Sequence, residues 1–486
     1  MLSHGSTVAF FMGGKKLGKK IMVDEHTPKQ SSYWQRFLHP WFAVPVMIVV
    51  MLIAAPFMYR SYKLSIISDP GEPFDVEAFI SAHTVPDSEN ALVPFRNILT
   101  LMKPSNDKTY PECGTALWNR VSINEYMQNT LDHVKDNEVA LIEFEKASQM
   151  PDYCEVQPAF INYTSSFVTT CNIRSYAELC VIRAWIASEN GKDAEATKWL
   201  LCNLRTSRLV ELHGCIMNRF VGIALHNLTS ETIIKWLARQ QLSQTELEKF
   251  LKEMQTIQQM TPPISDQIKM EYLMVLHSEE ILQGEVFPSS TPGAAKAVLP
   301  WAFYFQGEPE LLFRVYGHCV TNNLRYVDLP KYKRPSRSSH GSNICYLFVK
   351  PITESTHPSN LSPEKIELAA DSSVLFQLAY YQTGSMLEAV DLETMRQRLL
   401  ETAIQLELYR KSNGEFPDTL AQVFTSTETL PIDDLEAKGA ILNYVKEGPL
   451  HYRLWSVGAD GIDSGGVNLT LDKDAADLGI EMKRQP

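Results

Sequence analysis

A run of twenty residues without a charge, PWFAVPVMIVVMLIAAPFMY from Pro40 to Tyr59, constrains the fold of this 486-residue chain more than any other feature. An α-helix needs about 20 mostly apolar residues to cross the roughly 30 Å hydrocarbon core of a bilayer. Trp41 and Tyr59 stand at the two ends of the run, where aromatic side chains favour the membrane interface. The sequence therefore predicts one membrane span at residues 40–60 rather than a buried core helix.

The charges on either side of this run predict its orientation. Six basic and two acidic side chains precede it, and Arg60 and Lys63 follow closely behind it. Because an excess of basic residues is retained on the cytoplasmic side, we expect residues 1–39 to form a cytoplasmic tail. A cleavable signal peptide has an apolar region of about 7–15 residues, shorter than this run. We expect a retained single-pass anchor in the inner membrane with the bulk of the chain in the periplasm, and a cleaved signal peptide is the alternative.

The part of the chain beyond the run is acidic. Of the 45 Lys and Arg and 57 Asp and Glu in the whole chain, 38 basic and 55 acidic residues lie beyond residue 60, a net charge of −17. A surface of this sign repels nucleic acid and anionic lipid, so we expect no nucleic-acid partner. The apolar share of 44% and the charged share of 21% are typical of a folded protein and exclude a disordered chain.

All eight cysteines lie beyond the run, in the compartment where disulfides persist. Eight cysteines allow 105 pairings, so the sequence assigns no partners. Cys180 and Cys202 lie inside apolar helical stretches, where buried free thiols are an equal alternative. The cysteines are Cys113, Cys154, Cys171, Cys180, Cys202, Cys215, Cys319 and Cys345.

Helical periodicity dominates the middle of the chain. Two apolar-striped segments, residues 176–187 and 193–211, are separated by Glu-Asn-Gly-Lys, the composition of a tight loop between antiparallel helices. Ser243 followed by Glu246 forms a capping box ahead of another helix. No 34-residue repeat signature is present, so we expect an irregular helical bundle.

The C-terminal end has a different pattern. A long helix ends at Asn413-Gly414 and is followed by two strand-like runs, residues 440–445 and 450–457, which predict an antiparallel hairpin. The sequence GADGIDSGG comes directly after the second run. Its glycines permit tight turns, and its aspartate and serine side chains offer oxygen donors, so the loop either binds a cation or is held by Asx-type hydrogen bonds without one.

The order LELYRKSNGEFPDTL, YRLWSVGADGIDSGG and DAADLGI resembles the globular domain of the major pseudopilin of type II secretion. That family has a long helix, an NG-x-(F/Y)-P turn, a short sheet and a loop that reads roughly S-x-GADG and holds calcium. The resemblance covers about residues 395–480, and no pilin processing site precedes the apolar run. It implies a calcium site with ligands from Asp460, Asp463, Ser464, Val457 and either Asp474 or Asp477.

The layout of the whole chain, including the segment FDVEAFISAHTVPDSENALVPFR near the apolar run, resembles a family of membrane-anchored proteins from planctomycetes. This resemblance implies no activity. We expect a mainly α fold with one N-terminal transmembrane helix, an irregular helical bundle and a small C-terminal α+β module. The expected segments are a tail at 1–39, a span at 40–60, a linker and first helix at 61–114, an exported helical domain at 115–390 and a pseudopilin-like module at 391–486.

Common catalytic signatures are missing from the sequence. The chain has no GxSxG, HExxH, GxxxxGK[ST] or GxGxxG motif. We therefore expect a structural or protein-interaction component of the cell envelope, linked to secretion or surface assembly, whose partners are other envelope proteins. The alternative is an envelope hydrolase with a site between the helical domain and the 330–345 loop, built from several of His213, His318, His340, Glu279 and Asp371.

Overall fold

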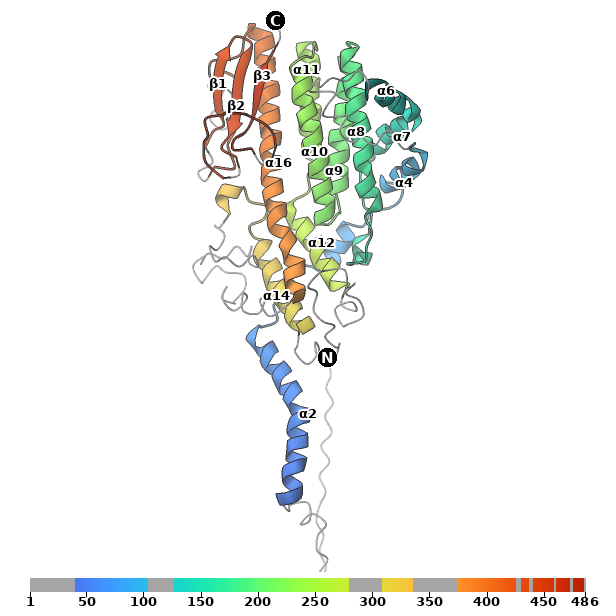
Figure 1. Cartoon of the computed structure of the whole chain (residues 1–486), viewed down its shortest axis with the longest axis vertical. Coiled ribbons are helices and arrows are strands. Elements are labelled where there is room, and N and C mark those ends of the chain that lie inside the picture. Colours follow the sequence, from blue (N-terminus) through green and yellow to red (C-terminus); the bar gives the residue numbers. More distant parts are fainter. Residues whose placement is uncertain are drawn as a thin grey trace, which may run out of the picture. The chain divides into compact units, whose positions relative to one another are not determined.

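The computed structural model describes residues 40–103, 126–278, 308–334, 374–424, 430–436, 440–458, 460–472 and 475–484. Within these residues the chain is mainly α-helical, and one small antiparallel sheet lies near the C-terminus (Figure 1). The predicted fold class is confirmed. The chain divides into two compact units, residues 1–58 and residues 59–486. We call the second unit the body.

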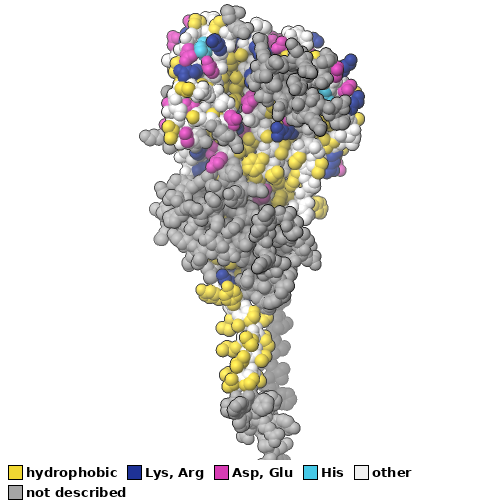
Figure 2. Space-filling view, viewed as in Figure 1, with side chains coloured by type: hydrophobic (Ala, Val, Ile, Leu, Met, Phe, Trp, Pro, Cys, Tyr) yellow, Lys and Arg dark blue, Asp and Glu magenta, His cyan; other side chains and the backbone are white. Residues whose placement is uncertain are grey.

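Helix α2, Pro40–Ile66, contains the apolar run, and its segment Ala43–Ser65 is long and apolar enough to cross a membrane. Pro45 and Pro56 both lie inside the helix. Most of the large apolar side chains from Val44 to Tyr59 are exposed, and Figure 2 shows this part of the helix as a mainly hydrophobic surface. An apolar surface of this length is what the hydrocarbon of a bilayer would cover.

Four long helices lie side by side in the body (Figure 1). Helix α9 packs against α8 and α10, and α10 packs against α16. Gly191, at φ +68°, forms the tight turn that was predicted between the first two of these helices. The bounds are α8 Val168–Glu189, α9 Asp193–Glu211, α10 Ile216–Leu237 and α16 Val374–Asn413.

Shorter helices complete the larger hydrophobic core. Helices α4 and α7 pack against each other and against α8, and α11 packs against α9 and α16. The stacked rings of Phe144 and Tyr176 fill the contact between α7 and α8. The bounds are α4 Leu92–Leu101, α6 Tyr126–Asp136, α7 Glu138–Ser148 and α11 Gln244–Gln258.

A second hydrophobic core lies where the end of α2, which is part of the body, packs against other helices. Leu64 and Ile67 are buried in it together with side chains of α3, α12 and α14. Met386, Leu387 and Val390 of α16 also belong to this core. The elements that surround this core are α3 Val76–Ala82, η1 Pro158–Phe160, α12 Ile264–Leu276, α14 Glu308–Asn323 and η3 Lys331–Lys333.

The sheet has the strand order β1-β2-β3 and packs against α16. The predicted hairpin is confirmed as β1 and β2, which pair from Asn443 with Trp455 to Gly448 with His451. The sequence analysis missed β3, which pairs with β2 along its whole length. The bounds are β1 Asn443–Gly448, β2 His451–Ser456, β3 Leu478–Lys483, and a short 3-10 turn, η5 Leu420–Gln422, precedes the sheet.

Four buried charges join α9, α10 and α16. The carboxylates of Glu211 and Glu393 each bind the guanidinium groups of both Arg208 and Arg219, at distances of 2.5–3.1 Å. All four side chains are at most 2% exposed. The charges cancel, which is the condition under which buried ions are tolerated. Gly222 of α10 makes room for this ion quartet, because a Cβ there would lie 2.2 Å from Cγ of Glu211.

Several local predictions can be compared with the structure. The capping box of Ser243 and Glu246 is formed, and α16 ends at Asn413 with Gly414 at φ +87°. Helix α4 begins at Leu92, whose amide donates to the side chain of Asn90 at 3.0 Å. The expected boundary between residues 390 and 391 falls inside α16.

The six cysteines among the described residues form no disulfide. Cys180 and Cys202 are buried thiols on neighbouring helices, which is the alternative that the apolar pattern left open. Burial raises the pKa of the Cys154 and Cys215 thiols to about 12, so these groups are unreactive near neutral pH. Cys113 and Cys345 lie outside the described residues.

Candidate functional site

The predicted calcium ligands lie in the loop between β2 and β3, where hydrogen bonds within the loop use them. Asp463 Oδ1 accepts from the Trp455 indole at 3.0 Å and from the Gly465 amide at 2.9 Å. Asp460 Oδ1 accepts from the Ile462 amide at 3.0 Å. Both are Asx-type turns of the kind that stabilise a loop without a metal.

Two buried aspartates hold the same loop from inside. Asp477 accepts from the amides of Ser464 at 3.0 Å and Gly466 at 2.7 Å, and Asp433 accepts from the amide of Val457 at 3.0 Å. The sequence analysis missed Asp433, which lies far from the loop in sequence and carries no motif.

The described acids of this loop do not bring three carboxylate oxygens within 4.8 Å of one another, and Asp474 lies outside the described residues. Calcium takes about six to eight oxygen ligands, which include main-chain carbonyls and water as well as carboxylates. The calcium site stays a prediction.

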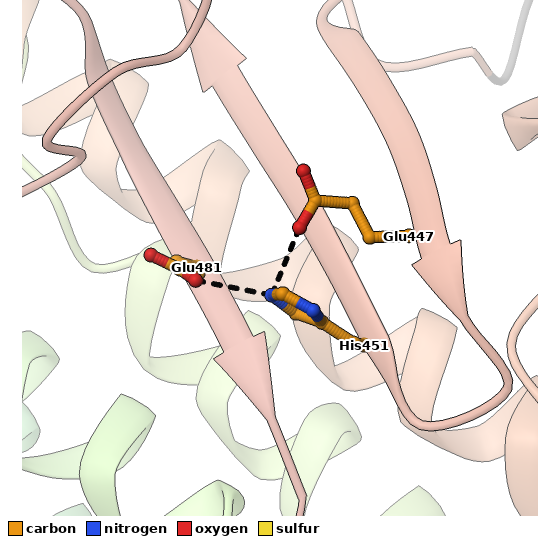
Figure 3. A group of neighbouring side chains, drawn as sticks. All are labelled: Glu447, His451 and Glu481. Atoms are coloured by element: carbon orange, nitrogen blue, oxygen red, sulfur yellow. Dashed lines mark hydrogen bonds and ion pairs between the residues drawn. The ribbon is translucent and has the colours of Figure 1, made fainter.

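The sheet carries a different group of metal-binding side chains, Glu447, His451 and Glu481 (Figure 3). Nε2 of His451 lies 3.2 Å from a Glu447 oxygen and 3.0 Å from a Glu481 oxygen. The other Glu447 oxygen accepts from Arg453 at 2.6 Å. These side chains lie on the exposed face of the sheet, and cross-strand ion pairs of this kind stabilise sheets without any ion.

Two histidines meet where four segments of the body converge. Nδ1 of His83, at the end of α3, lies 2.8 Å from Nδ1 of His213, in the loop between α9 and α10. The second nitrogen of each ring faces an aspartate: Nε2 of His213 lies 2.7 Å from Asp152, and Nε2 of His83 lies 3.9 Å from Asp266 of α12. We call these four residues the histidine cluster. His213 has φ +48°, an unusual backbone conformation for a residue other than glycine.

The charge of the histidine cluster depends on its surroundings. Burial is the largest cause of the lowered pKa of His83; Asp266 opposes it, and His213 and Lys269 add to it. Lys269 also pairs with Asp266 at 3.1 Å. Two imidazoles joined by a hydrogen bond need one unprotonated Nδ1 as acceptor, so at least one of the two rings is neutral.

The histidine cluster was not predicted. His213 pairs with His83, 130 residues away. Its sequence neighbour Cys215 is the N-cap residue of α10, and the Cys215 amide donates to Oδ1 of Asn218 at 3.2 Å.

Of the residues expected for the alternative hydrolase, His340, Glu279 and Asp371 lie outside the described residues. His213 belongs to the histidine cluster, whereas His318 bonds to the Ser68 carbonyl at 2.9 Å. In the 330–345 loop, Arg334 pairs with Asp391 of α16 at 2.9 Å. His213, His318 and Arg334 thus each contact a different residue.

The junction between α2 and α14 is built from charged side chains. Arg314 donates to the carbonyls of Leu64 at 2.7 Å and Ile67 at 3.0 Å, which are left unpaired where α2 ends. Glu310 accepts from Arg314 at 2.7 Å and from Arg60 at 2.5 Å. These bonds and that of His318 fix the last turns of α2 to the body.

A pocket of about 450 Å³ lies near the C-terminal end of α16. Gln405 and Tyr409 of α16, Gln244 of α11 and Phe424 contribute to its lining. Its lining residues offer the hydroxyls of Tyr409 and Ser412, but they include no histidine, cysteine or carboxylate beside these hydroxyls to activate them.

Comparison of the chain with models of protein families, with curated proteins and with solved structures gave no match.

Proposed function

We propose that this chain is a membrane-anchored structural component of the cell envelope. In this proposal α2 crosses the inner membrane, residues 1–39 stay in the cytoplasm and the body is exported to the periplasm. The body binds other envelope proteins that take part in secretion or surface assembly.

The observation that carries the proposal is the junction of α2 with the body. A helix apolar enough to cross a membrane continues without a break into turns that Arg314 and Glu310 bind. These hydrogen bonds lie within the body, so residues 60–67 at the end of α2 belong to a packed structure rather than to a free linker. This packing supports a structural role.

Exposed hydrophobic side chains on the body support a role in protein binding. Phe160 of η1 is 72% exposed and Val168 at the start of α8 is 58% exposed, while Val139 of α7 is 66% exposed. Figure 2 shows hydrophobic side chains gathered near the middle of the body in that view. Exposed apolar groups that gather in one region commonly mark protein interfaces.

Photo-crosslinking in intact cells tests this function. A photoreactive residue placed at Phe160 is expected to give a discrete adduct with another membrane or envelope protein. The matched control places the same residue at Lys252, an exposed position on α11, where no such adduct is expected. The proposal would be wrong if Phe160 gave no adduct, or if the two positions gave the same weak pattern.

A further inference from the structure

The histidine cluster brings two imidazole nitrogens together as a pair of potential metal ligands. Its two Nδ1 atoms face each other at 2.8 Å, and each Nε2 atom faces a carboxylate. Packing alone does not require two imidazoles to meet nitrogen to nitrogen, since an apolar pair would fill the same space without burying polar atoms.

We propose that His83 and His213 bind a late first-row divalent cation, Zn²⁺ as the test case, through their Nδ1 atoms, with water completing the coordination. Neutral imidazole is a preferred ligand of these ions. The inference is independent of the function proposed above, because it depends on neither the orientation of the chain nor its partners.

The two aspartates supply the outer partners that histidine ligands commonly have. A carboxylate facing the far nitrogen of a ligating imidazole holds the proton on that nitrogen and leaves the near nitrogen with a free lone pair. Asp152 has this position at His213, 2.7 Å from Nε2. Asp266 lies farther from His83, 3.9 Å from Nε2, where it acts as a nearby charge rather than a hydrogen-bond acceptor. Asp152 is itself fixed, because its main chain forms a bridge to Asn90 and its carboxylate accepts from the Tyr153 amide at 2.9 Å.

Only a small movement is needed to admit the ion. Zinc–nitrogen bonds of about 2.0–2.1 Å place two nitrogens of a tetrahedral site roughly 3.3 Å apart, about 0.5 Å more than the separation of the Nδ1 atoms. The two ring side chains are 17% and 16% exposed, so solvent reaches the cluster and can supply the remaining ligands.

The charges around the cluster suit a cation. The groups that face it are the carboxylates of Asp152 and Asp266 and the ammonium of Lys269, which sum to one negative charge. The hydrogen bond between the two Nδ1 atoms uses one proton. When the ion binds both atoms, that proton leaves its Nδ1 and passes to the Nε2 of the same ring or to water.

Calorimetric titration of the detergent-solubilised full chain with Zn²⁺, after treatment with a chelator, tests the proposal. We expect one binding event that is lost in His83→Gln and in His213→Asn; asparagine is chosen because it tolerates positive φ. Asp152→Asn is expected to weaken binding about 10–100-fold while leaving both ligands in place. Zn²⁺ should also raise the melting temperature of the wild type, because a ligand of the folded state stabilises it.

The control variant is His451→Gln, which removes the ligand shared by the group on the sheet and should leave the binding event unchanged. Loss of binding in His451→Gln alone would assign the ion to the sheet and overturn the proposal. Unchanged binding in both cluster variants, or no binding by the wild type, would also overturn it; the second result would leave the two rings as a pair that shares a proton. If His213→Asn fails to fold, His83→Gln and Asp152→Asn still decide the question.

Discussion

At the scale of single residues, the body depends on polar groups that are fully removed from water. The ion quartet of Arg208, Glu211, Arg219 and Glu393 is neutral as a whole, and each member is held by two others. Removing one member of such a set leaves an uncompensated buried charge, which costs about 3–5 kcal/mol. A substitution that displaces one member of the quartet should therefore lower the free energy of unfolding substantially.

Gly222→Ala is expected to destabilise the body by about 3–5 kcal/mol, because the added methyl group would displace the Glu211 carboxylate from its two arginines. Chemical denaturation followed by circular dichroism measures the change. Gly448→Ala is the control, since a Cβ there meets nothing closer than 3.9 Å. Equal stability of the two variants would show that the quartet tolerates displacement.

His226 predicts a dependence of stability on pH. Burial, followed by the charge of Arg208, lowers its pKa from 6.5 to about 3 in the folded protein. Below pH 6.5 the unfolded chain therefore binds a proton that the folded chain does not, and stability falls as the pH falls from about 6.5 towards 3. A tenfold difference in proton affinity corresponds to about 1.4 kcal/mol, so the loss is measurable by pH 5.

His226→Gln keeps a polar side chain near Gln397 but cannot titrate. The variant is expected to melt below the wild type at pH 8, and the gap should narrow as the pH is lowered to 5. Melting temperatures of both proteins across this range provide the measurement. A gap that stays constant with pH would mean that His226 does not contribute.

At the scale of elements, carboxylate and arginine side chains form hydrogen bonds to main-chain groups at the ends of helices and strands. Asp477 and Asp433 hold the loop that joins β2 to β3, and Arg314 holds the end of α2. In each case a side chain far away in sequence satisfies main-chain groups at the edge of an element.

Asp477→Asn removes one of the two acceptors that bind the amides of Ser464 and Gly466. The expected cost is about 1–3 kcal/mol, and it should be the same in calcium and in chelator because the geometry requires no ion. Asp460→Asn, at an exposed position with a single local bond, is the control and should change stability by less. A cost for Asp477→Asn that appears only with calcium would favour the metal site that the pseudopilin resemblance implies.

Arg314→Gln removes the bonds to Leu64 and Ile67, and hydrogen bonds to a charged group contribute about 1.5–3 kcal/mol. Hydrogen exchange of residues 64–71 should accelerate about tenfold or more. Arg174→Gln on α8, which disrupts a surface ion pair with Glu178, is the matched control and should leave these amides unchanged. Unchanged exchange in Arg314→Gln would mean that hydrophobic packing alone holds the junction.

At the scale of the whole molecule, the sequence predicted the features that local patterns encode. Such patterns depend only on neighbouring residues, as in the apolar run. The structure confirms three more of them: the turn at Gly191, the capping box at Ser243 and the end of α16 at Asn413. Strand β3 was missed because six residues with a weak alternation carry little signal by themselves.

The candidate site could not be predicted because its parts are distant in sequence. His83 and His213 are 130 residues apart, and Arg208 and Glu393 are 185 residues apart. Charged residues on helices usually face solvent. The local sequence of α9 and α16 therefore does not distinguish the buried charged side chains from those on the surface. Only the tertiary packing of α9, α10 and α16 brings these ions together.

The central claim, that α2 is a permanent membrane anchor with the body outside the cytoplasm, is tested most directly by protease protection. The full chain with an epitope tag before residue 1 is expressed, and intact spheroplasts are treated with protease. We expect the body to be digested while a short tagged fragment stays protected and resists extraction with alkaline carbonate. A tag that is digested while the body survives, or a chain that carbonate releases from the membrane, would contradict the account.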